Sequence, residues 1–231
     1  MLPLVGVPPT IAAFLSKYRD IFCRQEGFDH VSRYITGLLL SPNKTLEGIH
    51  SQQIWEEGKE VKRRAMHAAV FEAGWLSLGL MPRHREIVAG DHRGRGREVI
   101  GIDWTLSHHD RGTEIFGVKR AYDYVDKRMS GYQTVVTAAI TNGEMIDGLE
   151  VVVQTPDYQK EELAYLKMTS RDNYESMEQV LQRLEELLHY QKNRLAYRKR
   201  TEIAVEVVKQ IEEEGHFPEA DYAFDSVVLT V

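Results

Sequence analysis

The segment at 99–105, VIGIDWT, places one carboxylate, Asp103, inside an apolar run that is typical of a β-strand. A charged carboxylate in a low-dielectric environment is costly unless it is paired or coordinates a cation. Asp103 therefore either lies at a strand end, where it accepts backbone hydrogen bonds, or binds a metal ion. The local pattern leaves both interpretations open.

A second acid, Asp225, lies in the short apolar strand expected over 220–231. Counting in twos places Asp221, Ala223 and Asp225 on one face of that strand, with Asp221 at its start or in the preceding loop. A helical crossover before this strand would make it parallel to the strand of Asp103, so both acids could face one divalent ion. Two carboxylates suit Mg²⁺ or Mn²⁺, which activate a water or a 3′-hydroxyl for attack on a phosphodiester.

Short apolar segments separated by turn residues predict the strands that would position these acids. The expected strands cover 98–107, 113–125, 132–140 and 148–155. Because their connections are short, a consecutive antiparallel meander is the simplest topology.

Two helical segments, over 158–190 and 200–215, separate these strands from the last one. Ser176 and Gln179 form an expected capping box. The apolar stripe that follows it is expected to pack in the core; it comprises Met177, Val180, Leu181, Leu184, Leu187 and Leu188.

The first part of the chain is expected to be helical from residue 10 to residue 80, with Thr10 as the first cap. Further helices are expected over 30–40, about 44–55 and 63–75, and Pro82 is among the expected stops. A glycine- and arginine-rich segment follows. These patterns predict a helical module over 1–90, a basic linker over 91–97 and an α/β domain over 98–231.

The 231 residues carry a net charge of −6, but the charge is uneven. Residues 1–97 hold 14 Lys and Arg against 10 Asp and Glu, whereas residues 98–231 hold 15 against 25. The lone cysteine, Cys23, favours a reducing, cytoplasmic location. We expect no membrane association, because the longest aliphatic run is GLLL at 37–40 and the first residues lack the basic region of a signal peptide.

Two basic clusters are candidates for contacts with DNA phosphates, with a solvated surface as the equal alternative. The first cluster is Arg93, Arg95 and Arg97; the second is Lys192, Arg194, Arg198, Lys199 and Arg200. His108, His109 and Asp110 are expected in a loop rather than in a metal cluster, and Trp104 is expected in the core.

Several long runs resemble DDE-type insertion-sequence transposases of the "seven-oh-one" branch. They are GIDWTLSHHDRG, FGVKRAYDYVDKRMSGYQTVVTAAITN, ELAYL and YRKRTEIAVEVVKQIEEEGHFPEADYAFDSVVLT, and the helical region with RRAMHAAVFEAGW is similar as well. The resemblance implies a ribonuclease H-like catalytic domain, with Asp103 as the first acid on strand one and Asp225 as the second at the end of strand four. It also implies Mg²⁺ or Mn²⁺ as cofactor, and transposon terminal inverted repeats and target DNA as partners.

The chain departs from the family pattern, because the third acid of such enzymes lies beyond the second aspartate and no Asp or Glu follows Asp225. We therefore expect a truncated, catalytically incomplete transposase fragment, in which Glu202 and Glu206 are solvated helix residues rather than substitutes. The alternative is a non-catalytic DNA-binding or dimerising fragment that inhibits an intact transposase, and a remnant without a selected role is a third interpretation. In each case the expected fold is α/β: a helical N-terminal module followed by an incomplete ribonuclease H-like mixed sheet with flanking helices.

Overall fold

The structure is a computed structural model that describes residues 6–55, 60–73, 77–109, 115–123, 127–171 and 176–224. The chain divides into two compact units, Met1–Arg93 and Gly94–Val231. The division falls within the segment 91–97 that the sequence marks as a linker. The last helix of the first unit continues to His92, so the beginning of that segment is helical.

The first unit is helical in its described part. Its helices are α1 (Pro9–Ser16), the 3₁₀ turn η1 (Arg19–Ile21), α2 (Gln25–Leu40), α3 (Leu46–His50), α4 (Arg63–His67), the π-helical turn η2 (Ala68–Glu72) and α5 (Ser77–His92). Pro8, not Thr10, occupies the N-cap position of α1, without a side-chain cap hydrogen bond. The helix begins at Pro9, whose fixed φ suits the first helical position.

Pro82 lies inside α5 and does not end a helix, so that expectation was wrong. A proline removes one backbone hydrogen bond, and tertiary packing offsets this loss. Leu80 and Ile87 of α5 pack against the buried cluster of Tyr18, Ile21 and Phe22.

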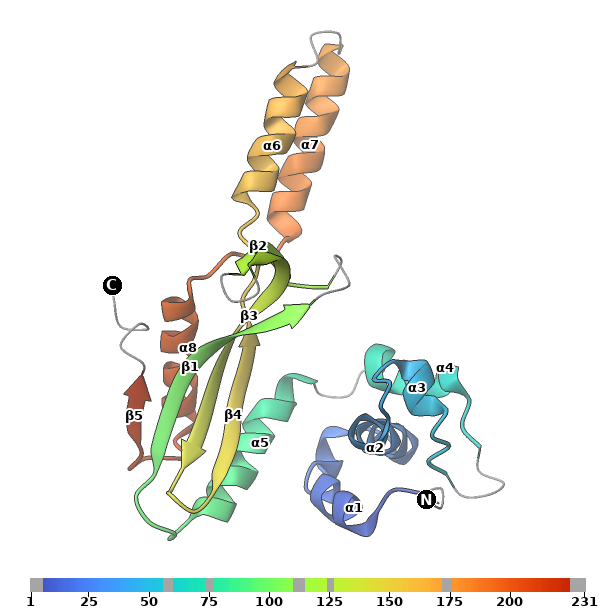
Figure 1. Ribbon diagram of the computed structural model, residues 1–231, viewed down its shortest axis with the longest axis vertical. Coiled ribbons are helices and arrows are strands. Elements are labelled where there is room, and N and C mark those ends of the chain that lie inside the picture. The colour runs from blue at the N-terminus through green and yellow to red at the C-terminus, as the bar shows by residue number, and fades with distance from the viewer. Residues whose placement is uncertain are drawn as a thin grey trace. The chain divides into compact units, whose positions relative to one another are not determined.

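The second unit is built on a five-stranded mixed sheet (Figure 1). Its strands are β1 (Val99–His109), β2 (Lys119–Asp123), β3 (Arg128–Thr141), β4 (Ile146–Val153) and β5 (Asp221–Phe224). Strand β3 is central: β1 pairs antiparallel along one edge, and β2 and β4 follow each other along the opposite edge. Strand β5 pairs parallel with β1, which confirms the expected return beside the first strand.

The pairing of consecutive strands differs from the expected meander. The first strand, β1, pairs with β3 and not with β2. Strand β2 has five residues and pairs with the beginning of β3, so β2 and β3 form a local hairpin. The eleven residues of β1 occupy the other edge of β3, from Gly131 to Thr141. The resulting meander of long strands is therefore β1, β3 and β4.

Three helices connect β4 to β5: α6 (Gln159–Arg171), α7 (Met177–Asn193) and α8 (Arg200–Glu214). The Ser176 Oγ accepts the backbone N–H of Gln179, whose side chain accepts the N–H of Ser176, so the capping box is confirmed. Helix α8 ends at Gly215, whose φ of 65° is the left-handed conformation that glycine adopts most readily.

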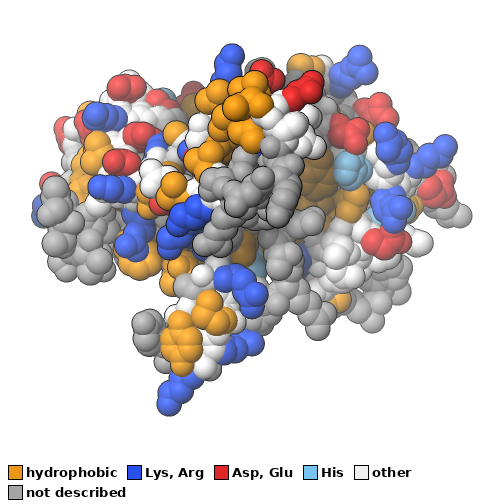
Figure 2. All heavy atoms as spheres, turned by 90° about the horizontal axis from the view of Figure 1, so that it is seen from above, with side chains coloured by type: hydrophobic (Ala, Val, Ile, Leu, Met, Phe, Trp, Pro, Cys, Tyr) orange, Lys and Arg blue, Asp and Glu red, His pale blue; other side chains and the backbone are white. Residues whose placement is uncertain are grey.

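Helices α6 and α7 form a hairpin that leads away from the sheet (Figure 1). The stripe on α7 was expected in the core, but Met177 is 75% exposed and Leu188 is 64% exposed, while Leu187 is buried. Figure 2 looks from above Figure 1, onto the end of this hairpin, and shows hydrophobic side chains at the surface between charged ones. A pattern at helical spacing indicates an amphipathic helix but not how many neighbours cover it.

The two faces of the sheet differ in burial. We call one the covered face: it carries Ile100, Ile102, Val136, Ala138 and Ile140, each at most 2% exposed, and α8 packs on it. The other we call the exposed face: it carries Asp103, Thr137 and Val151, which occupy paired positions on β1, β3 and β4. Side chains alternate between the faces because successive residues of a strand point to opposite sides.

Candidate functional site

Asp103 is the fifth residue of β1 and lies on the exposed face, opposite Thr137 of β3. Its Oδ1 accepts the backbone N–H of Trp104 at 2.7 Å. The strand continues for six residues beyond it, so Asp103 does not lie at a strand end. The side chain is exposed, which avoids the cost of burying a charge.

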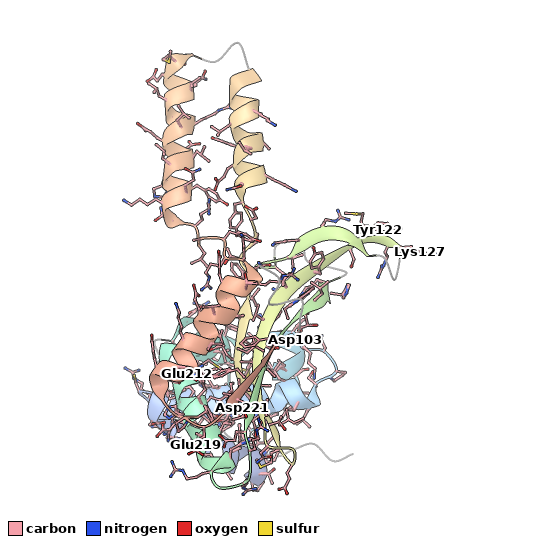
Figure 3. All side chains as sticks on the ribbon, turned by 90° about the vertical axis from the view of Figure 1, so that its left-hand side faces the viewer. Asp103, Tyr122, Lys127, Glu212, Glu219 and Asp221 are labelled. Atoms are coloured by element: carbon pink, nitrogen blue, oxygen red, sulfur yellow. The ribbon has the colours of Figure 1, made fainter. Side chains whose placement is uncertain are left out.

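Asp225 lies outside the described residues. The parallel pairing of β1 with β5 ends at the pair Ile102 and Phe224, each of which is followed directly in the sequence by an acid, Asp103 or Asp225. Asp221 pairs with Val99, at the opposite end of this ladder, so it lies apart from Asp103 (Figure 3). Its carboxylate accepts a hydrogen bond from Arg97 at 2.6 Å.

Asp103 fits a hard divalent cation, because it offers exposed carboxylate oxygen and its hydrogen bond from the Trp104 N–H engages Oδ1. Within the described part of the chain, no group of three or more His, Cys, Asp or Glu side chains could hold a metal ion. A complete ligand set is thus not brought together by these residues, and Asp225 lies beyond them.

Glu202 and Glu206, near the start of α8, each interact with a residue of the preceding segment. The Glu202 Oε2 accepts the backbone N–H of Lys199 at 2.8 Å, which completes a helix cap. Glu206 forms an ion pair with Arg198. These contacts account for both glutamates without a metal ion.

The adjacent histidines lie in β1 and not in a loop, which corrects that expectation. They point to opposite sides: the His108 Nδ1 lies 3.5 Å from Ser130 Oγ, and the His109 Nε2 lies 2.6 Å from Gln133 Oε1. Asp110 is outside the described residues. The two histidines therefore bind separate neighbours on β3.

The three arginines of the linker segment are divided between the two units. Arg93 belongs to the first unit, while Arg95 and Arg97 belong to the second. Arg95 donates to Met145 Sδ at 3.4 Å, and Arg97 is paired with Asp221.

The second basic cluster separates into two groups. Arg194 pairs with Glu162 and lies over the Tyr158 ring, 5.7 Å from its centroid, and Arg198 pairs with Glu206. Lys199 and Arg200, in contrast, line a pocket of about 520 Å³. Its lining residues are Trp104, Leu106, Lys119, Tyr132, Thr134, Gln154, Tyr197, Lys199, Arg200 and Thr201.

This pocket, the Trp104–Arg200 pocket, lies on the side of the sheet that α8 covers, where α8 begins. Trp104 and Leu106 continue the alternation of Ile100 and Ile102 along β1, so they face away from the side chain of Asp103. Trp104 is half-buried here and forms a pocket wall, which differs from the expected core position.

Aromatic rings support two of the pocket's cations. The Arg200 Cζ lies 3.7 Å from the Trp104 ring centroid, and the Lys119 Nζ lies 5.3 Å from that of Tyr197. Burial lowers the pKa of the Lys119 ammonium, and the nearby Arg200 guanidinium lowers it as well, whereas Asp157 raises it. Lys119 and Arg200 line the same pocket, and Asp157 offsets part of the effect of Arg200 on Lys119.

A part-buried hydrogen bond and a tight glycine turn shape the pocket wall. The Gln154 Nε2 donates to the backbone oxygen of Arg198 at 2.8 Å, and this contact holds the segment before α8 against the end of β4. Gly117 precedes β2 with φ 76°, and a Cβ there would lie 2.8 Å from the Val153 Cγ1. A glycine is required at this turn, which leads into the strand of Lys119.

Sequence reasoning found Lys199, Arg200 and Trp104 but assigned no role to Lys119, Tyr132, Gln154 or Tyr197. Their grouping depends on the pairing of β2 with β3 and on the position of α8. Neither this strand pairing nor the position of α8 can be predicted from residue spacing along the chain. The Tyr-Arg-Lys-Arg run at 197–200 was the available local indication.

The chain matches no protein-family model, no curated protein and no solved structure. Among the described helices, none combines the length and the apolar character needed to cross a bilayer.

Proposed function

We propose that the second unit is the core of a metal-dependent DNA transposase, in which Asp103 and Asp225 hold Mg²⁺ or Mn²⁺ for cleavage and transfer of DNA strands. The observation that carries this proposal is the parallel pairing of β5 with β1. Its register brings Phe224 opposite Ile102, one residue before each of the two acids.

The sheet order supports the proposal. Strands β4, β3 and β1 are antiparallel neighbours, and β5 returns beside β1 after the helical crossover. This is the arrangement that the ribonuclease H-like resemblance implies: a meander of three strands followed by a strand parallel to the first. Counting in twos from Ala223 predicts that Asp225 shares the exposed face with Asp103.

The exposure of Asp103 also supports the proposal, because a phosphodiester must reach the acid. A divalent ion bound there would supply a Lewis acid and an activated oxygen nucleophile. Asp103 would contribute Oδ2, while the N–H of Trp104 orients the carboxylate through Oδ1.

Mn²⁺ binding to the full chain, measured by water-proton relaxation, tests the proposal without requiring turnover. We expect the wild type to bind Mn²⁺, and Asp103→Asn and Asp225→Asn each to lower the affinity by about tenfold or more, because each removes a charged oxygen ligand. Glu144→Gln, in the exposed turn between β3 and β4, is the matched control and should bind as the wild type does.

The unfolding free energy of Asp103→Asn should remain within about 0.5 kcal/mol of the wild type, since the residue is exposed. A wild type that does not bind Mn²⁺ would contradict the proposal. Equal affinity in wild type and Asp103→Asn would contradict it as well.

A further inference from the structure

The Trp104–Arg200 pocket concentrates cations that form no direct ion pair with the described residues, although Asp157 acts on Lys119 at longer range and Glu202 caps the backbone of Lys199. Among those residues, no carboxylate forms an ion pair with Lys119, Lys199 or Arg200. This differs from Arg97, Arg194 and Arg198, each of which is paired with an acid. The charge stands out in a unit whose residues 98–231 are acidic overall.

Arg200 is held in a geometry suited to an anion. Its guanidinium lies 3.7 Å from the centroid of the Trp104 ring. A guanidinium over an aromatic face keeps its N–H groups available at its edge, where they match the oxygens of a phosphate. Because the ring already orients the guanidinium, less conformational entropy is lost when an anion binds.

Lys119 reaches the same pocket from β2, where burial lowers the pKa of its ammonium most, Asp157 opposes this shift, and repulsion from Arg200 adds to it. An anion between the two groups would convert this repulsion into two attractions. The first turn of α8 adds the partial positive charge of a helix N-terminus at Lys199 and Arg200, which the Glu202 carboxylate on the Lys199 N–H offsets in part.

The remaining wall favours a nucleotide strand over an isolated anion. Tyr132 and Tyr197 line the pocket beside the cations, and Tyr197 is 39% exposed. Aromatic rings interleaved with cations are the composition of surfaces that bind single strands, because unpaired bases stack on the rings and phosphates meet the cations.

We propose that the Trp104–Arg200 pocket binds a phosphate group of single-stranded DNA between Arg200 and Lys119, with an adjacent base against Tyr132 or Tyr197. The choice of DNA rests on the proposed function. The pocket opens on the opposite side of the sheet from the Asp103 side chain, so the phosphate held here is not the one that reacts. This site is a contact that holds the strand, separate from the metal ligands.

Fluorescence anisotropy of a labelled single-stranded oligonucleotide with the full chain, in EDTA, tests the proposal without metal chemistry. Arg200→Ala and Lys119→Ala are each expected to weaken binding by about tenfold, the effect of losing one charge-assisted hydrogen bond. Each should also lower the slope of log affinity against log salt by about 0.7, the value for one lost contact with a single strand. Arg200→Lys should weaken binding as well, because it keeps the charge but loses the planar contact with Trp104.

Lys209→Ala is the matched control: it removes one exposed cation from the same helix, outside the pocket, and should bind as the wild type does. Circular dichroism should show that each variant is folded. Unchanged DNA binding in folded Arg200→Ala and Lys119→Ala would overturn the proposal.

Displacement of the labelled probe by unlabelled ligands identifies the source of the bound phosphate. We expect an unlabelled single strand to displace the probe better than a duplex of the same sequence, and inorganic phosphate to displace it poorly. Displacement by inorganic phosphate as effective as by the single strand would overturn the assignment to DNA. Because this binding is measured in EDTA and the Mn²⁺ test uses no DNA, failure of the Mn²⁺ test and failure of this test are distinguishable.

Discussion

The two faces of the sheet in the second unit differ in burial and in the residues that they carry. On the covered face, β1 contributes Ile100 and Ile102, which α8 shields from solvent. On the exposed face the same strand contributes Asp103, and β4 contributes Val151, which is 61% exposed. Buried apolar residues and exposed residues therefore alternate along one strand, so the neighbours Ile102 and Asp103 lie in different environments.

The largest expected effect is on the covered face. Ile102→Ala should lower the free energy of unfolding by about 2–5 kcal/mol, because it removes a side chain that is 1% exposed and leaves a cavity beneath α8. Denaturant titration of the full chain measures this loss. A loss below about 1 kcal/mol, typical of surface positions, would show that the two faces are not distinct.

The same substitution at two valines, one on each face, tests the difference in burial directly. Val136→Thr places a hydroxyl at a position that is 2% exposed and should cost about 1–3 kcal/mol, the penalty of a buried polar group without a partner. Val151→Thr makes the same change on the exposed face of β4 and should be within about 0.5 kcal/mol of the wild type. Equal losses in both variants would contradict the assignment of the faces.

The smallest effect concerns Tyr222 of β5, which pairs with Ile100 and belongs to the covered face. Its hydroxyl is buried and has no hydrogen bond of good geometry with the described residues; burial, together with the nearby Glu212 carboxylate, raises its pKa well above the ordinary value of 10. The folded protein therefore holds this proton more tightly than the unfolded chain. The contribution of this group to the free energy of unfolding is fully present below pH 10 and falls as the pH rises above 10.

Tyr222→Phe should abolish this alkaline loss and leave the free energy of unfolding at pH 7 within about 1 kcal/mol of the wild type, because the interaction of the buried hydroxyl with Glu212 lacks good hydrogen-bond geometry. Denaturant titrations of both proteins at neutral and alkaline pH measure the difference. An equal alkaline loss in the variant would assign the effect to other groups.

Local patterns predicted the elements of the second unit better than their pairing. The alternation at Ile100, Ile102 and the residues between them marked β1, and the spacing of Ile203 and Val207 marked α8. The assignment of β3 as the partner of β1 could not be predicted, because strand neighbours depend on contacts far apart in the sequence. The prediction that the last strand runs parallel to the first succeeded because a helical crossover restricts the connection.

The residues of the candidate site likewise divide into those that a local sequence pattern reveals and those that only the fold brings together. Asp103 could be found from the sequence, because one acid in an apolar run is a local feature. The grouping of Lys119 with Arg200 could not be found, because it results from β2, β3 and α8 meeting in space. The stripe at Leu181 and Leu188 was assigned to the core because its period is helical, yet periodicity does not tell how much of a helix is covered.

The α6–α7 hairpin has a consequence for the cooperativity of unfolding. Met177, Leu181 and Leu188 remain more than half exposed, so the hairpin buries little apolar surface compared with the sheet. Segments of this kind open at a lower free energy than the core and exchange their amide hydrogens earlier. We therefore expect two cooperative regions in the second unit, and native-state amide hydrogen exchange should show α6 and α7 exchanging earlier than β1 and β3.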